Sequence, residues 1–227
     1  MKYKFLLFDV DRTLLDFDKS EENALRKTLK QHKIKLSTRM IQYYRNINEA
    51  LWKNFEQGHI TKKEIVNIRF KNFFELFNIN LDPTKFNDEY LLNLKNTNYK
   101  ILNATKILKK LSKDFEIYVV TNGIKEIQEN RLKLSGLNQF IKKTFISEEI
   151  GSQKPKYSFY KYVFNNIENF EKEKAITIGD SLSSDILGGN NAGIKTIWFN
   201  SAKEKTNPNI IPDFEIYKLK QLYKILY

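Results

Sequence analysis

Short runs of apolar residues recur along the chain, and segments with helical spacing separate them. Because the runs are apolar on both faces, they are typical of strands buried in a parallel sheet. Six strands are expected, at Tyr3–Phe8, Glu116–Val120, Thr144–Ser147, Ala175–Ile178, Thr196–Phe199 and, more weakly, Phe214–Ile216. Two helix faces between them consist of Ala104, Ile107, Leu108 and Leu111, and of Phe159, Tyr160, Val163, Phe164 and Ile167. This alternation predicts an α/β fold built on a doubly wound parallel sheet.

One interval, from about residue 17 to 96, has helical patterns only. Its apolar stripe at Met40, Tyr44, Ile47, Leu51 and Phe55 is followed by a second at Phe70, Phe73, Phe74 and Phe77. Thr61 and Glu64 have the spacing of a capping box, and Asp82-Pro83 reads as an N-cap followed by proline at N1. The sequence therefore predicts a discontinuous α/β core domain, residues 1–16 and 97–227, with an inserted domain of four helices, residues 17–96.

The first expected strand ends in two acids, Asp9 and Asp11. Ligands of open α/β sheets bind beyond the carboxyl ends of the strands, and unpaired carboxylates there are costly without a cation. Mg²⁺ prefers oxygen ligands of this kind. The pair therefore indicates a metal site, and the alternative is an acidic turn after a strand.

The second strand ends in Thr121-Asn122-Gly123, ahead of a helical segment. Backbone N–H groups at the start of a helix bind phosphate oxygens well, although the same residues also make an ordinary N-cap. Lys154 precedes Pro155, again at the ligand end of the sheet, where a lysine would neutralise a phosphate. In a lysine-rich chain the alternative is a solvent-facing side chain.

The fourth strand ends in Gly179-Asp180, and Asp185 lies in the following turn. Glycine lets the backbone approach other groups closely. The two acids complete a carboxylate cluster with Asp9 and Asp11, whereas the alternative for Asp185 is a contact with the helix N-terminus. Four polar segments thus follow strand ends in the order D-x-D-x-T, T-N-G, K-P and G-D-x-x-x-x-D.

Composition narrows the class of protein. The chain has 227 residues, 41% of them hydrophobic, so it can bury a sizeable core. It has no cysteine, which excludes disulfides and thiolate metal sites, and no apolar stretch approaches a membrane span, so we expect a cytoplasmic protein. The net charge of +12 leaves nucleic-acid binding open, but scattered lysine favours a solvated surface without a specific nucleic-acid partner.

Along nearly its whole length the chain resembles the haloacid dehalogenase (HAD) superfamily, whose four motifs the four segments match. The helical insertion resembles that superfamily's C1 cap, on a Rossmann-like core. The resemblance implies that Asp9 is the nucleophile, that Asp11 is the general acid and base, and that Lys154 holds Asp9 and the phosphate. Haloacid dehalogenases lack the second acid, so Asp11 favours phosphoryl transfer. Arg12 departs from the commoner Gly, Asp or Asn of that turn.

The resemblance also implies the ligands. Mg²⁺, which Mn²⁺ or Co²⁺ would replace, would be bound by Asp9, the backbone carbonyl of Asp11, and Asp180, with Asp185 acting mostly through water. The phosphate would contact Asp9, Asp11, Thr121, Asn122, Gly123 and Lys154. The resemblance implies that the binding partner is a small phosphate ester and that the protein does not associate with a membrane. It also implies that the protein is a monomer or a dimer.

A finer resemblance is to YjjG-type pyrimidine 5′-nucleotidases. It rests on Leu51-Trp52, the segments 55–61, 145–151 and 184–189, and Arg69-Phe70. It implies UMP, dUMP and dTMP as substrates, with the turn at 57–60 closing over the base. Trp52 and Phe55 have a plainer alternative as helix packing. Three other functions stay open: a phosphatase or mutase for sugar phosphates or phosphoglycolate, a basic nucleic-acid-binding protein, and an inactive relative.

Overall fold

The computed structural model describes residues 2–227 and divides the chain into two compact units. One unit comprises Met1–Phe17 and Asn98–Tyr227, and the other comprises Asp18–Thr97. No helix among the described residues has both the length and the apolarity that a bilayer span requires.

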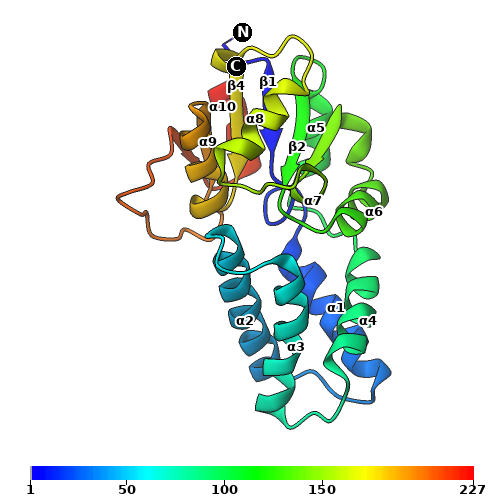
Figure 1. The fold of residues 1–227 in the computed structure, drawn as a ribbon. Coiled ribbons are helices and arrows are strands. Elements are labelled where there is room, and N and C mark those ends of the chain that lie inside the picture. Colours follow the sequence, from blue (N-terminus) through cyan, green and yellow to red (C-terminus); the bar gives the residue numbers. More distant parts are fainter. Residues whose placement is uncertain (1) are drawn as a thin grey trace. The chain divides into compact units, whose positions relative to one another are not determined.

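The first unit is built on a sheet of six strands within the described residues, in the order β3-β2-β1-β4-β5-β6 (Figure 1). All neighbouring strands run parallel. Their bounds are β1 Phe5–Phe8, β2 Glu116–Thr121, β3 Lys143–Ile146, β4 Ala175–Gly179, β5 Lys195–Phe199 and β6 Phe214–Ile216. The predicted fold class is confirmed, and each predicted strand overlaps an observed one.

Helices cover both faces of this sheet, because successive side chains of a buried strand point to opposite sides. Leu6 and Phe8 of β1 pack in the apolar cluster that holds α5 (Ala104–Leu111) and parts of α6 (Lys125–Ser135) and α10 (Leu222–Leu226). Phe5 and Leu7 pack in the cluster that holds α8 and Ala192 of α9. The remaining bounds are α7 Ser147–Ile150, α8 Tyr157–Asn165 and α9 Leu187–Ala192. Short turns of helix lie at Asn138–Phe140, Lys172–Lys174, Leu182–Ile186 and Leu219–Gln221.

The second unit holds four helices within its described residues: α1 (Phe17–Gln31), α2 (Thr38–Glu56), α3 (Lys62–Phe77) and α4 (Pro83–Lys95). The first residue of α1, Phe17, belongs to the first unit, because the second unit begins at Asp18. The predicted caps are present. Thr61 and Glu64 form a reciprocal capping box, and the Asp82 side chain accepts from the N–H groups at the start of α4. Figure 1 shows these helices in cyan, blue and green.

The interior of the helical unit is aromatic, with Tyr44, Phe70, Phe73, Phe86 and Tyr90 all at most 1% exposed. A polar network lies among these rings. Arg69 donates to Asn48 (3.2 Å) and Asn87 (2.5 Å), and Asn48 donates to Glu21 (2.9 Å). The buried line of α2 therefore includes Asn48, whereas the predicted stripe members Ile47 and Leu51 are only half-buried. Hydrogen bonding explains the difference, since a buried amide needs polar partners.

Candidate active site

Asp9 extends strand β1 by one residue at the ligand end of the sheet. Its N–H donates to the carbonyl of Ile178 at 2.9 Å, which continues the β1–β4 ladder, and its side chain is largely buried. The chain then turns sharply, and Arg12 adopts a left-handed backbone with φ 58°. Gly, Asn and Asp tolerate that conformation better than other residues, so Arg12 carries a backbone strain of about 1 kcal/mol.

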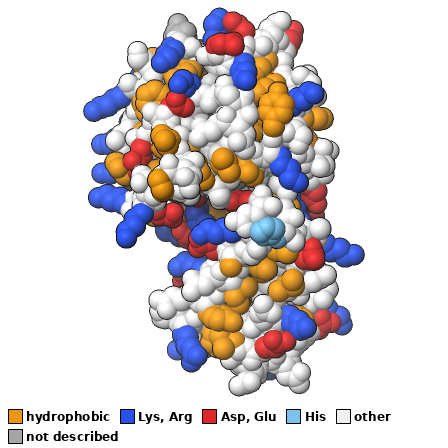
Figure 2. All heavy atoms as spheres, turned by 60° about the vertical axis from the view of Figure 1, so that its left-hand side comes forward, with side chains coloured by type: hydrophobic (Ala, Val, Ile, Leu, Met, Phe, Trp, Pro, Cys, Tyr) orange, Lys and Arg blue, Asp and Glu red, His pale blue; other side chains and the backbone are white. Residues whose placement is uncertain are grey.

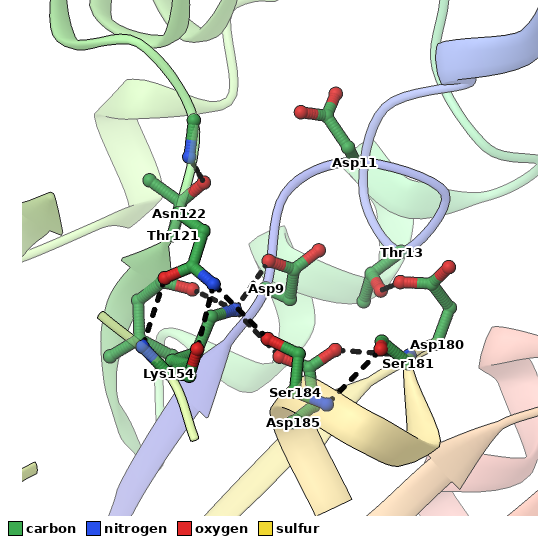
Figure 3. Close-up of polar contacts among 12 residues, drawn as sticks. Asp9, Asp11, Thr13, Thr121, Asn122, Lys154, Asp180, Ser181, Ser184 and Asp185 are labelled. Carbon is green, nitrogen blue, oxygen red and sulfur yellow. Dashed lines mark hydrogen bonds and ion pairs between the residues drawn. The ribbon is translucent and has the colours of Figure 1, made fainter. Parts of the chain in front are cut away.

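Lys154 lies at the centre of the site. The residue is 1% exposed, and Nζ donates to Asp9 Oδ1 (2.7 Å), Asp185 Oδ1 (2.6 Å) and the carbonyl of Val120 (2.8 Å) (Figure 3). A lysine ammonium has three N–H donors, and all three are used. The solvent-facing alternative for this lysine is therefore wrong: Lys154 is a fixed, buried cation between two acids.

Asp180 and Asp185 follow strand β4. Asp185 lies in the turn Leu182–Ile186, and its second carboxylate oxygen accepts from the Ser181 N–H at 3.1 Å. Its side chain occupies the space beside Gly179, where an added Cβ would lie 2.5 Å from the Cβ of Asp185. Glycine is thus required at position 179 because the acid fills the place of a side chain. Two further groups hold Asp180: Thr13 Oγ1 lies 3.5 Å from its carboxylate, and Trp198 Nε1 donates to its carbonyl at 2.7 Å.

The cluster carries more acid than base. Burial raises the pKa of Asp9 to about 7, with Asp185 and Asp11 adding to the rise and Lys154 opposing it. Burial and the charges of Asp9 and Asp185 raise the pKa of Asp180 well above its usual range. Burial alone would lower the pKa of Lys154, but the carboxylates of Asp185 and Asp9 outweigh it and raise that pKa.

The same acids fit a divalent cation. Asp9, Asp180 and Asp185 each offer a carboxylate oxygen, and these oxygens lie within 4.8 Å of one another. The hard oxygen donors and the excess negative charge suit Mg²⁺. Bound metal would also remove the mutual repulsion that raises the pKa values of Asp9 and Asp180.

The Thr121-Asn122-Gly123 turn ties two strand ends together. The Asn122 amide donates to the Lys154 carbonyl (3.0 Å) and to Ser184 Oγ (3.3 Å), and its oxygen accepts from the Lys154 N–H (3.0 Å). This side chain therefore fixes the backbone of Lys154. The Gly123 N–H donates to Thr121 Oγ1 at 3.1 Å.

Asp11 lies apart from the other acids, and its carboxylate points away from the group formed by Asp9, Lys154 and Asp185 (Figure 3). It is held from helix α6: Arg131 Nη1 donates to Oδ1 (2.6 Å), and Gln128 Nε2 donates to Oδ2 (2.7 Å). Neither Gln128 nor Arg131 was predicted from the sequence. Their spacing of three on a helix that follows the T-N-G turn was the available signal, because it puts both side chains on one helix face.

Known proteins are similar to this chain over nearly its whole length. Residues 6–199 match the family model of haloacid dehalogenase-like hydrolases. The chain is 40% identical to the HAD-hydrolase YfnB of Bacillus subtilis, covering 99% of this chain and 96% of YfnB. It is 41% identical to the pyrimidine 5′-nucleotidase PynA of Streptococcus pneumoniae, over 100% of this chain and 96% of PynA.

A third relative and a solved structure extend the comparison. The pyrimidine 5′-nucleotidase YjjG of Escherichia coli is 28% identical over 100% of this chain and 99% of its own. A crystal structure of YfnB from Bacillus subtilis bound to magnesium superposes with a TM-score of 0.95, covering 100% of this chain and 99% of that one. From the family match and from these full-length relatives, we conclude that the chain belongs to the haloacid dehalogenase-like hydrolases.

Proposed function

We propose that this hydrolase removes phosphate from pyrimidine nucleoside 5′-monophosphates, with Mg²⁺ as cofactor and an aspartyl phosphate at Asp9, a mixed anhydride, as intermediate. The observation that carries the proposal is the buried contact of Lys154 with Asp9, in a cluster that Asp180 and Asp185 complete. Two relatives named pyrimidine 5′-nucleotidases, matched over the whole chain, support the substrate class.

In the first half of the reaction, a carboxylate oxygen of Asp9 attacks phosphorus and the bond to the nucleoside oxygen breaks. Asp11 gives its proton to that oxygen, so the nucleoside leaves as a neutral alcohol. In the second half, water attacks the phosphorus of the aspartyl phosphate while Asp11 takes a proton from the water. Inorganic phosphate then leaves and the Asp9 carboxylate is restored.

The surrounding groups supply charge and position. Lys154 fixes the Asp9 carboxylate and faces the incoming phosphate with positive charge, while Thr121 and the N–H groups of Asn122 and Gly123 hold phosphoryl oxygens. For Gly123 this requires its N–H to turn from Thr121 to the ligand. Mg²⁺ held by Asp9, the Asp11 carbonyl and Asp180, with Asp185 acting through water, would neutralise the phosphate's equatorial oxygens.

We assign the helical insertion, residues 17–96, the part of a C1 cap that selects the substrate. The turn at 57–60 is exposed at its first three residues and joins α2 to α3, which suits it to contact a base. Phe55 is buried and meets Trp52 edge-on, with 5.7 Å between ring centroids, so packing accounts for Phe55. Arg69 is also buried, 3% exposed, and packs inside the helical unit.

The surface offers less support to a nucleic-acid partner. Specific nucleic-acid surfaces gather arginine and lysine on one face. On the face of the molecule in Figure 2, Lys and Arg side chains are interspersed with acidic and uncharged ones. The +12 charge is therefore assigned to solvation and to a general attraction for phosphate esters.

The test is phosphate release from UMP, dUMP, dTMP, sugar phosphates and phosphoglycolate, with Mg²⁺ and with EDTA. The wild type is compared with Asp9→Asn and with the control Asp88→Asn, which changes an exposed acid. We expect release from the pyrimidine nucleotides that is lost in EDTA and in Asp9→Asn only.

Two other results would change the proposal. Release only from non-nucleotide esters would keep the mechanism and refute the substrate class. Isomerisation of a sugar phosphate without phosphate release would replace hydrolysis by a mutase reaction. Mass spectrometry of the quenched enzyme adds a direct readout, because the wild type should carry a phosphoryl group that Asp9→Asn lacks.

A further inference from the structure

The carboxylate of Asp11 is held by two side chains of α6 that have no part in the mechanism so far. Both of its oxygens are engaged, one by Arg131 (2.6 Å) and one by Gln128 (2.7 Å). Two donors on two oxygens leave a carboxylate little freedom to rotate about its side-chain bonds. The orientation of Asp11 is therefore set from α6, and not by its own loop alone.

The two donors support each other. Arg131 Nη1 also donates to Gln128 Oε1 at 3.1 Å, and Gln128 Nε2 also donates to Thr121 Oγ1 at 3.1 Å. The guanidinium of Arg131 lies 5.7 Å from the ring centroid of Phe17. Gln128 thus connects Asp11 with Thr121, so the residue assigned to proton transfer and the residue assigned to phosphate binding share one partner.

The T-N-G turn provides the room for this arrangement. A Cβ added at Gly123 would lie 2.6 Å from Cγ of Gln128, well inside van der Waals contact. Any residue other than glycine at position 123 would displace the Gln128 side chain. The absence of a side chain at Gly123 therefore makes the place that Gln128 occupies.

Stability alone does not explain why Arg131 and Gln128 occupy these positions on α6. Arg131 and Gln128 are each 1% exposed. The Asp11 side chain, in contrast, is 31% exposed, so its ion pair with Arg131 is only partly buried. Such a pair is expected to add little stability, because solvent weakens the attraction at Asp11 while burial of the guanidinium costs desolvation. An apolar pair would pack α6 against the sheet, but it would leave the carboxylate of Asp11 unrestrained.

The direction of Asp11 suits its assigned role. In phosphoryl transfer the attacking and leaving oxygens lie roughly in line across phosphorus. The leaving oxygen is therefore on the far side of phosphorus from Asp9, away from Lys154 and Asp185. Figure 3 shows the Asp11 carboxylate pointing away from those three residues.

We propose that Gln128 and Arg131 are positioning residues, which hold the Asp11 carboxylate where it meets the leaving oxygen and the attacking water. The inference rests on the proposed function, because it gives Asp11 the proton-transfer role. It concerns the orientation of the side chain, and it assigns neither Gln128 nor Arg131 a contact with the reacting atoms.

The experiment compares Arg131→Met, Arg131→Lys and Gln128→Leu with Lys133→Met, which removes an exposed lysine from the same helix. For UMP we expect kcat to fall by about 10²-fold in Arg131→Met and Gln128→Leu, the loss typical of misplacing a catalytic group by about 1 Å. KM should change by less than about threefold in Arg131→Met, because the interactions that bind substrate and transition state equally well are unchanged. Arg131→Lys should recover part of kcat.

A second substrate separates positioning from general damage. The p-nitrophenolate ion leaves phosphorus without a proton, so p-nitrophenyl phosphate needs Asp11 only in the second half of the reaction. Arg131→Met should therefore release a rapid burst of one equivalent of p-nitrophenol, followed by slow turnover. In an Asp11→Asn background, Arg131→Met should change the remaining rate by less than about twofold, because the two residues act as one unit.

Three outcomes would overturn the inference or its basis. Wild-type kcat in both Arg131→Met and Gln128→Leu, with Asp11→Asn inactive, would refute positioning and leave the proposed function intact. A raised KM at unchanged kcat would show that the pair serves binding only. Full activity in Asp11→Asn would refute the acid–base role itself. If Arg131→Met fails to fold by circular dichroism, the uncharged change Gln128→Leu decides between these outcomes.

Discussion

Replacing Lys154 by methionine tests whether one buried cation holds the acid cluster together. Lys154 Nζ makes three contacts of 2.6–2.8 Å, two of them with carboxylates, and the residue is 1% exposed. Methionine keeps most of the stem volume, so cavity formation adds little. Removing one partner of a buried ion pair costs about 3–5 kcal/mol, because the remaining charges are left uncompensated. We expect a fall of that size in the free energy of unfolding at neutral pH.

The assay is urea denaturation in EDTA, so that no metal replaces the lost charge. A Trp52→Phe background makes Trp198, in the sheet-containing unit, the single tryptophan reporter. A loss of 3–5 kcal/mol corresponds to a shift of the midpoint by about 1–2 M urea. The matched control is Lys156→Met, an exposed lysine two residues along, which should stay within about 0.5 kcal/mol of the parent.

A double variant examines the cause. If repulsion between the acids produces the loss, adding Asp185→Asn to Lys154→Met should restore part of the stability, because one uncompensated charge is removed. The single and double changes should therefore be non-additive by at least about 1 kcal/mol. A stability of Lys154→Met within 1 kcal/mol of the parent, by the assay whose typical error is about 10–15%, would refute the view that Lys154 neutralises this cluster.

Three further predictions concern metal, pH and the helical unit. Asp180→Ala should raise the Mg²⁺ concentration for half-maximal phosphate release by at least about tenfold, because even replacing residues that only hydrogen-bond to metal ligands lowers metal affinity by that much. An unchanged Mg²⁺ requirement would contradict direct ligation by Asp180. Burial would raise the pKa of Asp213, but the bonds from Lys195 and Thr196 outweigh it and lower that pKa. The stabilisation by Asp213 should therefore be complete above its usual pKa and disappear as pH falls through the lowered one. Asp213→Asn should cost about 1 kcal/mol at pH 7, and thermal unfolding should show this cost shrinking as the pH is lowered below the usual pKa. Arg69→Met should destabilise the helical unit by about 2–3 kcal/mol, read from Trp52 fluorescence in urea, because two buried amides lose a charged donor; an equally stable variant would mean that the rings alone hold this interior.

Much of the fold could be predicted because the information is local. A strand buried on both faces needs an unbroken apolar run, and such runs located the six strands, with Phe214–Ile216 matching at both ends. Caps are equally local, so Thr61 with Glu64 and Asp82 with Pro83 marked the starts of their helices. The grouping of the acids followed from topology, because parallel strands deliver their carboxyl ends to one edge of the sheet.

Contacts between distant segments needed the tertiary structure. Gln128 and Arg131 lie 117 and 120 residues from Asp11. Their spacing puts them on one face of α6, but it does not indicate that this face turns toward Asp11. The family resemblance predicted that Lys154 holds Asp9, but only the fold shows that its side chain is buried between Asp9 and Asp185. Electrostatic interactions depend on distance and burial, and the chain sets neither until it folds.

The sequence by itself therefore determined the class of fold, the order of its elements and the residue types that collect at one sheet edge. The tertiary structure alone decided the further pairings: Lys154 with Asp185 in addition to Asp9, Asp11 with α6, and Asn122 with the backbone of Lys154. The apolar pattern of an element can be read from the sequence, because each helix or strand buries one or two of its own faces. A hydrogen bond between side chains requires both partners within about 3 Å in three dimensions, which only the packed molecule provides.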